Sequence, residues 1–187
     1  MVDFGITHSR EAPPLVVDLD GTLTARGTIR ECLCRLARER PWWLPRLLVS
    51  LVRGRAVGTD HLAHLVDPAP ERLPYRPQVL AFLRAERARG RRLILATATP
   101  RRIADAVAGH LGLFDAVIAS DRTRTRAGVV KLTAMREVVR GGAFDYMGDK
   151  RADLPLFRAA RLAILVHPSK HLLSRAQASC RVGHVLD

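Results

Sequence analysis

An apolar run that ends in two aspartates is the feature that most restricts how this chain can fold. Residues 15–19 read LVVDL, and Asp20 and Gly21 follow directly. Continuous aliphatic runs are typical of parallel strands that are buried on both faces, whereas charged residues followed by glycine favour a loop. We therefore predict a buried strand that ends near Asp18 and opens into a loop.

The rest of the chain alternates between short apolar runs and helical patterns. Further strands are predicted in four places, at residues 91–97, 116–120, 144–149 and 162–166. Helices are predicted between them, over residues 77–89, from Pro100 onward, over 131–140 and over 151–160. From His167 we expect a short tail that holds one helix. Strands that alternate with helices indicate an α/β fold, with a mostly parallel sheet and helices on both faces.

Polar side chains follow three of the predicted strands. Asp18 and Asp20 end the first, Thr97 ends the second and Asp149 ends the fourth. In open α/β sheets, sites form at the carboxyl ends of the strands. Three separate segments therefore bring polar groups to one edge of the sheet, where we predict the functional site.

The chain is strongly basic. Its 187 residues suit one α/β domain with a modest insertion, and they include 31 basic and 18 acidic residues, for a net charge of +13. The basic residues are mostly arginines spread along the whole chain, so we interpret them as an arginine-rich solvated surface. Binding to nucleic acid, phosphates or an anionic membrane is the alternative interpretation. No nucleic-acid recognition motif is present, so we do not expect nucleic acid as a partner.

Cysteine usage and hydropathy indicate the compartment. Three cysteines without metal-binding spacing (Cys32, Cys34 and Cys180) predict free thiols in a reducing cytoplasm. Residues 1–14 have no apolar core, so we expect no signal peptide. The most apolar stretch, WWLPRLLVSLV at Trp42 to Val52, is about half the roughly twenty residues that a membrane span needs, although it could lie on a membrane surface.

Four motifs occur in order along residues 15–166. They are VVDLDGTLT (16–24), LILATAT (93–99), Lys131 and GDKRAD (148–153). Together they resemble the four motifs of the haloacid dehalogenase (HAD) superfamily, with phosphoserine-phosphatase-like relatives. The resemblance implies a Rossmann-like HAD fold and a phosphatase that forms an aspartyl-phosphate.

The resemblance also implies a role for each motif residue. Asp18 would be the nucleophile, because a carboxylate that attacks phosphorus divides one difficult displacement into two easier steps. Asp20 would protonate the leaving oxygen and then activate water. Thr97 would bind a phosphoryl oxygen, and Lys131 would offset negative charge. Mg²⁺ would be the cofactor, held by Asp18, by the backbone carbonyl of Asp20 and by Asp149.

Other positions near the motifs have a supporting role or an open one. Thr22 is expected to stabilise the loop after Asp20, and Gly148 belongs to the fourth motif. Asp153 would ligate water on the metal or orient Lys131; alternatively, it is an acid stabilised by the helix dipole. Arg126 is a second cation near Lys131, and Asp121 is either a substrate contact or a loop acid.

The segment between the first two motifs is where HAD enzymes insert a cap. We predict a core domain of residues 1–24 and 74–187, and a helical cap of residues 25–73 with helices over 29–40, 43–53 and 58–66. Glu31 and Arg30 would face the substrate, or they are ordinary solvated residues. The Trp42 to Val52 stretch would pack on the core, or form a membrane-facing rim for lipid phosphates.

A narrower resemblance concerns the substrate. Residues 73–121 and 144–166 look very like the soluble HAD domain that is fused to UbiA-type polyprenyl transferases in some bacteria. The chain departs from that pattern at Ala127, where a lysine is expected, and at Lys150, where a small residue is usual. This predicts a Mg²⁺-dependent phosphomonoester hydrolase in the cytoplasm or at the inner face of the membrane, acting on a small or lipid-linked phosphate, with a polyprenyl- or phosphoribosyl-linked phosphate as the candidate. A phosphotransferase or mutase and a non-enzymatic basic binding protein are the alternatives; the oligomeric state is not readable.

Overall fold

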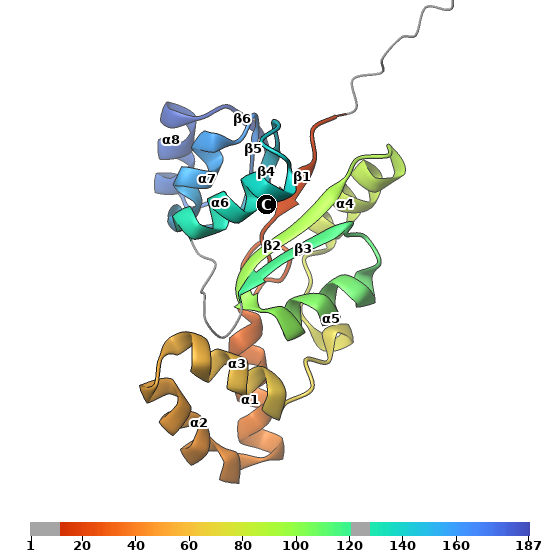
Figure 1. Ribbon diagram of the computed structural model, residues 1–187. Helices are drawn as coiled ribbons and strands as arrows, with labels where there is room; N and C mark the ends of the chain where they lie inside the picture. Colours follow the sequence, from red (N-terminus) through yellow and green to blue (C-terminus); the bar gives the residue numbers. More distant parts are fainter. Residues whose placement is uncertain (1–11, 121–127) are drawn as a thin grey trace, which may run out of the picture.

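The computed structural model describes residues 12–120 and 128–187, and its centre is a parallel sheet (Figure 1). The described residues form a six-stranded sheet in the order β3-β2-β1-β4-β5-β6, with every neighbouring pair parallel. The strands are β1 (Leu15–Val17), β2 (Leu93–Pro100), β3 (Ala116–Ser120), β4 (Asp145–Gly148), β5 (Ala163–Val166) and β6 (Val182–Leu186). The prediction of an α/β fold with a mostly parallel sheet is confirmed.

Helices connect the strands and follow the predicted segments closely. The helices are α1 (Thr28–Glu39), α2 (Leu44–Val52), α3 (Arg55–Leu65), α4 (Pro77–Ala88), α5 (Arg101–Leu111), α6 (Gly128–Val138), α7 (Leu154–Ala159) and α8 (Lys170–Ser179). Three short 3-10 helices lie between them, η1 (Pro41–Trp43), η2 (Pro70–Arg72) and η3 (Arg151–Asp153). Among the described residues, no helix is long and apolar enough to cross a membrane.

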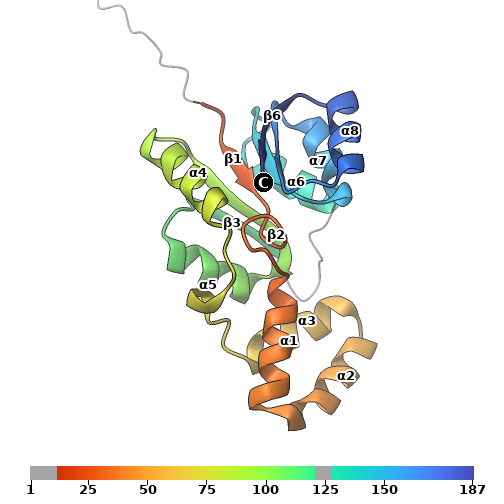
Figure 2. The same cartoon turned by 180° about the vertical axis from the view of Figure 1, so that it is seen from behind.

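Each face of the sheet has its own core, because successive strand residues point to opposite faces. Leu15 and Val17 pack with apolar residues of α4 and α5 on one face, whereas Val16 packs with residues of α6, α7 and α8 on the other. The two helical layers are visible on either side of the sheet in Figures 1 and 2. Burial on both faces explains why these strands read as continuous apolar runs.

Helices α1, α2 and α3 form a separate unit beyond the ends of β1 and β2 (Figure 2). The unit has its own small core, which includes Leu36 of α1, Leu47 of α2 and Leu62 of α3. Ile103 of α5 joins the same core, so the unit rests on the first turn of α5. This arrangement places the unit over the edge of the sheet where the polar residues gather.

The C-terminal segment differs from the prediction. A tail with one helix was expected after His167, but the chain forms α8 and then β6, which pairs in parallel with β5 at the edge of the sheet. Most of β6 is exposed, so it lacks the apolar run that marks the buried strands. Predictions for residues 1–11 and for Asp121, Arg126 and Ala127 lie outside the described residues.

Candidate active site

The site lies where β1, β2 and β4 end side by side. Val17 of β1 is in register with Leu95 of β2 and with Met147 of β4. Asp18 directly follows β1, and Asp149 directly follows β4, so the two acids leave neighbouring strands at the same edge. The chain passes to β2 and β3 on one side of β1 and then to β4 on its other side, so the strand order reverses at β1. Open α/β sheets bind ligands at the carboxyl ends of the strands at such a switch point.

Asp18 and Lys131 form a buried ion pair. The side chains are 9% and 4% exposed, and Lys131 Nζ donates a hydrogen bond of 2.6 Å to Asp18 Oδ1. Lys131 Nζ also donates to the hydroxyl oxygen of Tyr146 at 2.8 Å, and that hydroxyl donates to Asp153 Oδ1 at 3.2 Å. Tyr146 therefore links Asp153 to Lys131 through two hydrogen bonds. The sequence reasoning did not identify Tyr146 as a site residue. Burial, together with the charges of Asp18 and Asp153, raises the pKa of Tyr146 well above its usual value, so the phenol remains a donor.

Asp20 is fixed by two threonines that the sequence reasoning also missed. The backbone N–H and the hydroxyl of Thr28 donate to Asp20 Oδ1 at 2.6 and 2.8 Å. The hydroxyl of Thr99 donates to Asp20 Oδ2 at 2.5 Å. Asp20 thus accepts from the first turn of α1, where an acidic side chain is favoured by unpaired N–H groups and by the helix dipole. The same contacts tie the acid to the start of the helical unit.

Thr97 lies in β2 and is almost fully buried. Its hydroxyl accepts a hydrogen bond of 3.0 Å from the backbone N–H of Thr99. Thr97 therefore braces the strand end that presents Thr99 to Asp20. Its predicted contact with a phosphoryl oxygen stays a prediction.

Two further acids converge beside Asp18. Carboxylate oxygens of Asp18, Asp149 and Asp153 lie within 4.8 Å of one another. Burial, followed by the charge of Asp18, raises the pKa of Asp153 to about 6. Burial also raises the pKa of Asp149, although the charge of Lys150 and a hydrogen bond from Thr22 oppose the shift. A group of acids this close needs a cation to hold it in the ionised form.

Thr22 has a more direct position than expected. It was predicted to stabilise the loop after Asp20, and its hydroxyl donates to Asp149 Oδ1 at 2.9 Å, which links this loop to the end of β4. The neighbouring Gly21 has a φ of +95°, and a Cβ there would lie 2.0 Å from Asp149 Oδ2. The loop after β1 thus contacts Asp149 through a hydroxyl and needs a glycine to approach it so closely.

Gly148 is also sterically required. A Cβ there would lie 2.8 Å from the ring of Tyr146 and 2.9 Å from Asp153 Oδ2. The glycine of the fourth motif therefore leaves room for the two side chains that support Lys131.

Lys150 brings a second cation into the acid cluster. Its ammonium donates a hydrogen bond to the backbone carbonyl oxygen of Asp20 and lies 3.8 Å from Asp18 Oδ2 and 3.8 Å from Asp149 Oδ1. These are the three groups that the HAD motifs assign to Mg²⁺. Because two carboxylates and a carbonyl are oxygen donors that suit Mg²⁺, and because they already surround a cation, the residues fit the metal.

A cavity of about 470 Å³ opens beside Asp20, between the core and the helical unit. Thr99, Pro100 and Ser120 line it from the core, and the helical unit contributes Ile29, Leu51, Arg55, Ala56, Thr59 and Asp60. Leu51 belongs to the Trp42 to Val52 stretch that the sequence singled out, but none of these cap residues was predicted to line a cavity beside Asp20. They come from α1, α2 and α3, so only the packing of these helices brings them together.

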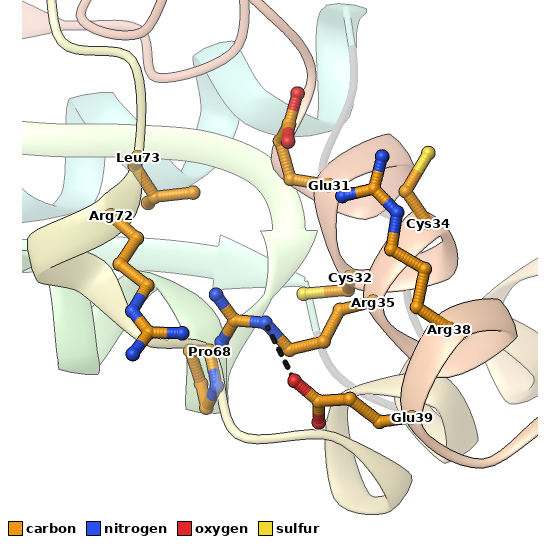
Figure 3. Close-up of a pocket in the computed structure, with 9 residues that line it drawn as sticks. All are labelled: Glu31, Cys32, Cys34, Arg35, Arg38, Glu39, Pro68, Arg72 and Leu73. Atoms are coloured by element: carbon orange, nitrogen blue, oxygen red, sulfur yellow. Dashed lines mark ion pairs between the residues drawn. The ribbon is translucent and has the colours of Figure 1, made fainter.

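Arg30 and Glu31 do not line this cavity. Arg30 is exposed, and Glu31 lines a separate pocket of about 280 Å³ on α1 together with Arg35, Arg38 and Arg72 (Figure 3). Glu31 also lies 3.9 Å from Arg26 in an exposed ion pair. A substrate contact by Arg30 or Glu31 stays a prediction.

A family comparison agrees with this geometry. Residues 44–158 match the family model of the haloacid dehalogenase-like hydrolases. The chain belongs to this family. The matched range contains the lysine of the third motif and the whole GDKRAD segment, and it begins after Asp18 and Asp20. For those two acids, the HAD assignment rests on the motif and on the contacts described above.

Related proteins are found by sequence and by structure. Uncharacterized protein y4nM of Sinorhizobium fredii is 37% identical over 153 residues, which cover 82% of this chain and 30% of that protein. The chain thus spans less than a third of the length of that relative.

Solved structures share the fold. A protein of unknown function from Bordetella pertussis Tohama I has a TM-score of 0.71 at 20% identity, with 95% of this chain and 99% of that chain covered. Phosphoserine phosphatase in a substrate-bound form has a TM-score of 0.59 at 16% identity, with 94% and 93% covered. Its phospho-aspartyl intermediate analogue has a TM-score of 0.59 at 15% identity, with 95% and 94% covered. The chain therefore has the fold of HAD-family phosphatases, and it carries an aspartate cluster.

Proposed function

We propose that this chain is a Mg²⁺-dependent phosphomonoester hydrolase that forms an aspartyl-phosphate on Asp18. The observation that carries the proposal is that two neighbouring acids, Asp18 and Asp20, differ in burial and in their contacts. Asp18 is buried against the ammonium of Lys131, whereas Asp20 is partly exposed and borders the cavity. This is the division that a nucleophile and a general acid–base require.

The reaction would proceed in two displacements. In the first, a carboxylate oxygen of Asp18 bonds to phosphorus while the ester P–O bond breaks, and the leaving oxygen takes a proton from Asp20. In the second, Asp20 removes a proton from water, the water oxygen bonds to phosphorus, and inorganic phosphate leaves Asp18. Lys131 holds the nucleophile in place and offsets charge on the phosphoryl group.

Mg²⁺ would be held by Asp18, the carbonyl of Asp20 and Asp149. It would supply positive charge that lowers the repulsion between the carboxylates and an incoming phosphate. Thr22 orients Asp149 for this role, and Asp153 supports Lys131 through Tyr146. These contacts hold the oxygen donors close to one another.

The residues that line the cavity beside Asp20 support a substrate with both apolar and charged parts. Ile29, Leu51 and Ala56 offer apolar surface, and Arg55 adds a positive charge at the same opening. We propose a phosphate ester whose leaving group combines apolar and anionic parts, of which a polyprenyl- or phosphoribosyl-linked phosphate is the candidate. The resemblance to HAD domains fused to UbiA-type transferases supports the same class.

The exposed surface of η1 and α2 supports peripheral contact with an anionic membrane. Trp42 is 69% exposed and Val52 is 89% exposed, and Arg46 and Arg53 are exposed beside them. Aromatic and aliphatic side chains flanked by arginines are typical of helices that lie in a membrane interface. With the free cysteines, this favours a cytoplasmic protein at the inner face of the membrane.

Flotation with anionic liposomes tests the membrane contact. We expect the wild type to float and the Trp42→Glu/Val52→Glu variant to stay in the bottom fraction. Val130→Glu is the matched control, because Val130 is 47% exposed on α6, away from this surface. Equal flotation of all three proteins would show that Trp42 and Val52 do not bind the membrane.

Phosphate release from an aryl phosphate, sugar phosphates, phosphoserine, nucleotides and prenyl phosphates tests the hydrolase. We expect Mg²⁺-dependent release that is lost with chelator and in Asp18→Asn. Asp105→Asn is the control, because Asp105 is half-exposed on α5. Phosphate transfer to an added alcohol without net release would favour the phosphotransferase. Neither release nor transfer, with salt-dependent anion binding that survives Asp18→Asn, would favour a binding protein.

A further inference from the structure

Lys150 occupies the position that the proposed metal would need. Its ammonium contacts the carbonyl oxygen of Asp20 and lies within ion-pair distance of Asp18 and Asp149. The backbone N–H of Lys150 donates to Asp153 Oδ2 at 3.2 Å, which fixes the start of the side chain beside the cluster. The three groups that would bind Mg²⁺ therefore already surround a cation of the chain itself.

The ammonium and a divalent ion cannot share this place. Mg²⁺ needs oxygen ligands at about 2.0–2.1 Å in near-octahedral geometry, and an ammonium offers donors only. Two cations at that separation would also repel each other strongly. Metal binding must therefore displace the ammonium of Lys150 from the carbonyl of Asp20.

Lys150 can leave the site, whereas Lys131 cannot. The Lys150 side chain is 49% exposed, and that of Lys131 is 4% exposed. A lysine ammonium sits on a flexible four-carbon stem, so a half-exposed one can turn into solvent. The two lysines beside Asp18 thus differ in the freedom that an exchange requires.

We propose that Lys150 is a built-in competitor of the divalent cation, which holds the acid cluster together without metal and must swing out before the metal binds. This inference rests on the metal dependence in the proposed function. It makes the apparent metal affinity of the wild type weaker than the oxygen donors alone would give. The position of Lys150 directly after Asp149 therefore sets the metal concentration at which the site is loaded.

Calorimetric titration of the substrate-free protein with Mg²⁺ tests the exchange directly. We expect Lys150→Met to bind Mg²⁺ about tenfold more tightly than the wild type, because a half-exposed lysine with two ion pairs favours the closed position by roughly that ratio. Lys170→Met is the matched control, since Lys170 is exposed at the start of α8, and its affinity should equal that of the wild type. Unchanged or weaker binding by Lys150→Met would overturn the proposal.

The thermal midpoint gives an independent readout. In chelator, Lys150→Met should unfold at a lower temperature than the wild type, because its carboxylates lack a counter-charge, and Mg²⁺ should raise its midpoint by more than that of the wild type. An equal Mg²⁺ response in both proteins would contradict the exchange.

Asp149→Asn separates this inference from the proposed function. Binding that disappears in Asp149→Asn but is equally tight in the wild type and Lys150→Met would refute only the role of Lys150. No binding by any of these proteins would refute the metal site as well.

Discussion

Replacement of Lys131 by methionine should damage stability and catalysis together. Methionine keeps much of the volume of lysine and removes the charge, so Asp18 would lose its 2.6 Å partner while it stays buried. Breaking a buried ion pair on one side typically costs about 3–5 kcal/mol. We expect about 3 kcal/mol, the lower end, because Lys150 lies 3.8 Å from the other oxygen of Asp18 and still offsets part of the charge.

Two assays measure the consequences of Lys131→Met. A loss of about 3 kcal/mol corresponds to a fall of roughly 6–12 °C in the thermal midpoint for a chain of this size. Loss of one preorganised charge at the phosphoryl group should lower kcat by about 10²–10³-fold. Lys170→Met, which removes an exposed lysine, should change neither value.

A double-mutant cycle tests whether the effect belongs to the pair. Asp18→Asn removes the charge that Lys131 neutralises, so the double variant should lose less stability than the sum of the single variants, by about 1–3 kcal/mol. If the two costs add within about 0.5 kcal/mol, Asp18 and Lys131 are not coupled and the reasoning is wrong.

Three further variants test other parts of the site and fold. Gly21→Ala should abolish activity and lower the thermal midpoint, since its Cβ would lie 2.0 Å from a carboxylate oxygen at a φ of +95°; an active, stable variant would contradict this. Thr99→Val removes the 2.5 Å hydrogen bond to Asp20 and should lower kcat about tenfold, with a fall of a few degrees in the thermal midpoint, whereas unchanged kinetics would exclude a positioning role. Burial raises the pKa of Asp115, but hydrogen bonds from Arg87 and from the backbone N–H of Leu93, together with the charges of Arg87 and Arg92, outweigh burial and lower the pKa overall. The stabilisation from Asp115 is therefore present above about pH 4 and is lost as pH falls further. Asp115→Asn should therefore lose less thermal stability between pH 6 and 3 than the wild type; an equal loss would refute the assignment.

The sequence predicted the strands that are buried on both faces, because such burial requires continuous apolar runs. β1, β2, β4 and β5 are buried along most of their length, so apolar runs in the sequence predicted where they lie along the chain. β6 was missed because only one strand pairs with it and its side chains are mostly exposed. A strand whose existence depends on its neighbour leaves little signal in its own residues.

The site was readable where chemistry demands residue types at fixed short spacing. Asp18 and Asp20 share one loop, and Asp149 and Asp153 share another, so sequence alone could group them. Tyr146 was missed because a tyrosine within an apolar strand also reads as a core residue, and only the fold brings Lys131 to it.

The threonines around Asp20 illustrate the same limit. Thr28 and Thr99 lie 8 and 79 positions from Asp20, and their contact depends on how the first turn of α1 meets the end of β2. No spacing in the sequence encodes that meeting. Contacts of this kind are set by packing between elements, which is why the cavity residues were missed as well.

Lys150 shows what a departure from a family pattern can mean once its surroundings are known. In the sequence it was only an unusual residue after Asp149. In the structure, four aspartates lie near two lysines, and those lysines differ in exposure by about tenfold, 49% against 4%. A buried lysine cannot exchange with solvent cations without leaving a buried carboxylate unpaired, whereas a half-exposed one can. The cluster therefore has a permanent counter-charge in Lys131 and, if Lys150→Met binds Mg²⁺ more tightly, an exchangeable one in Lys150.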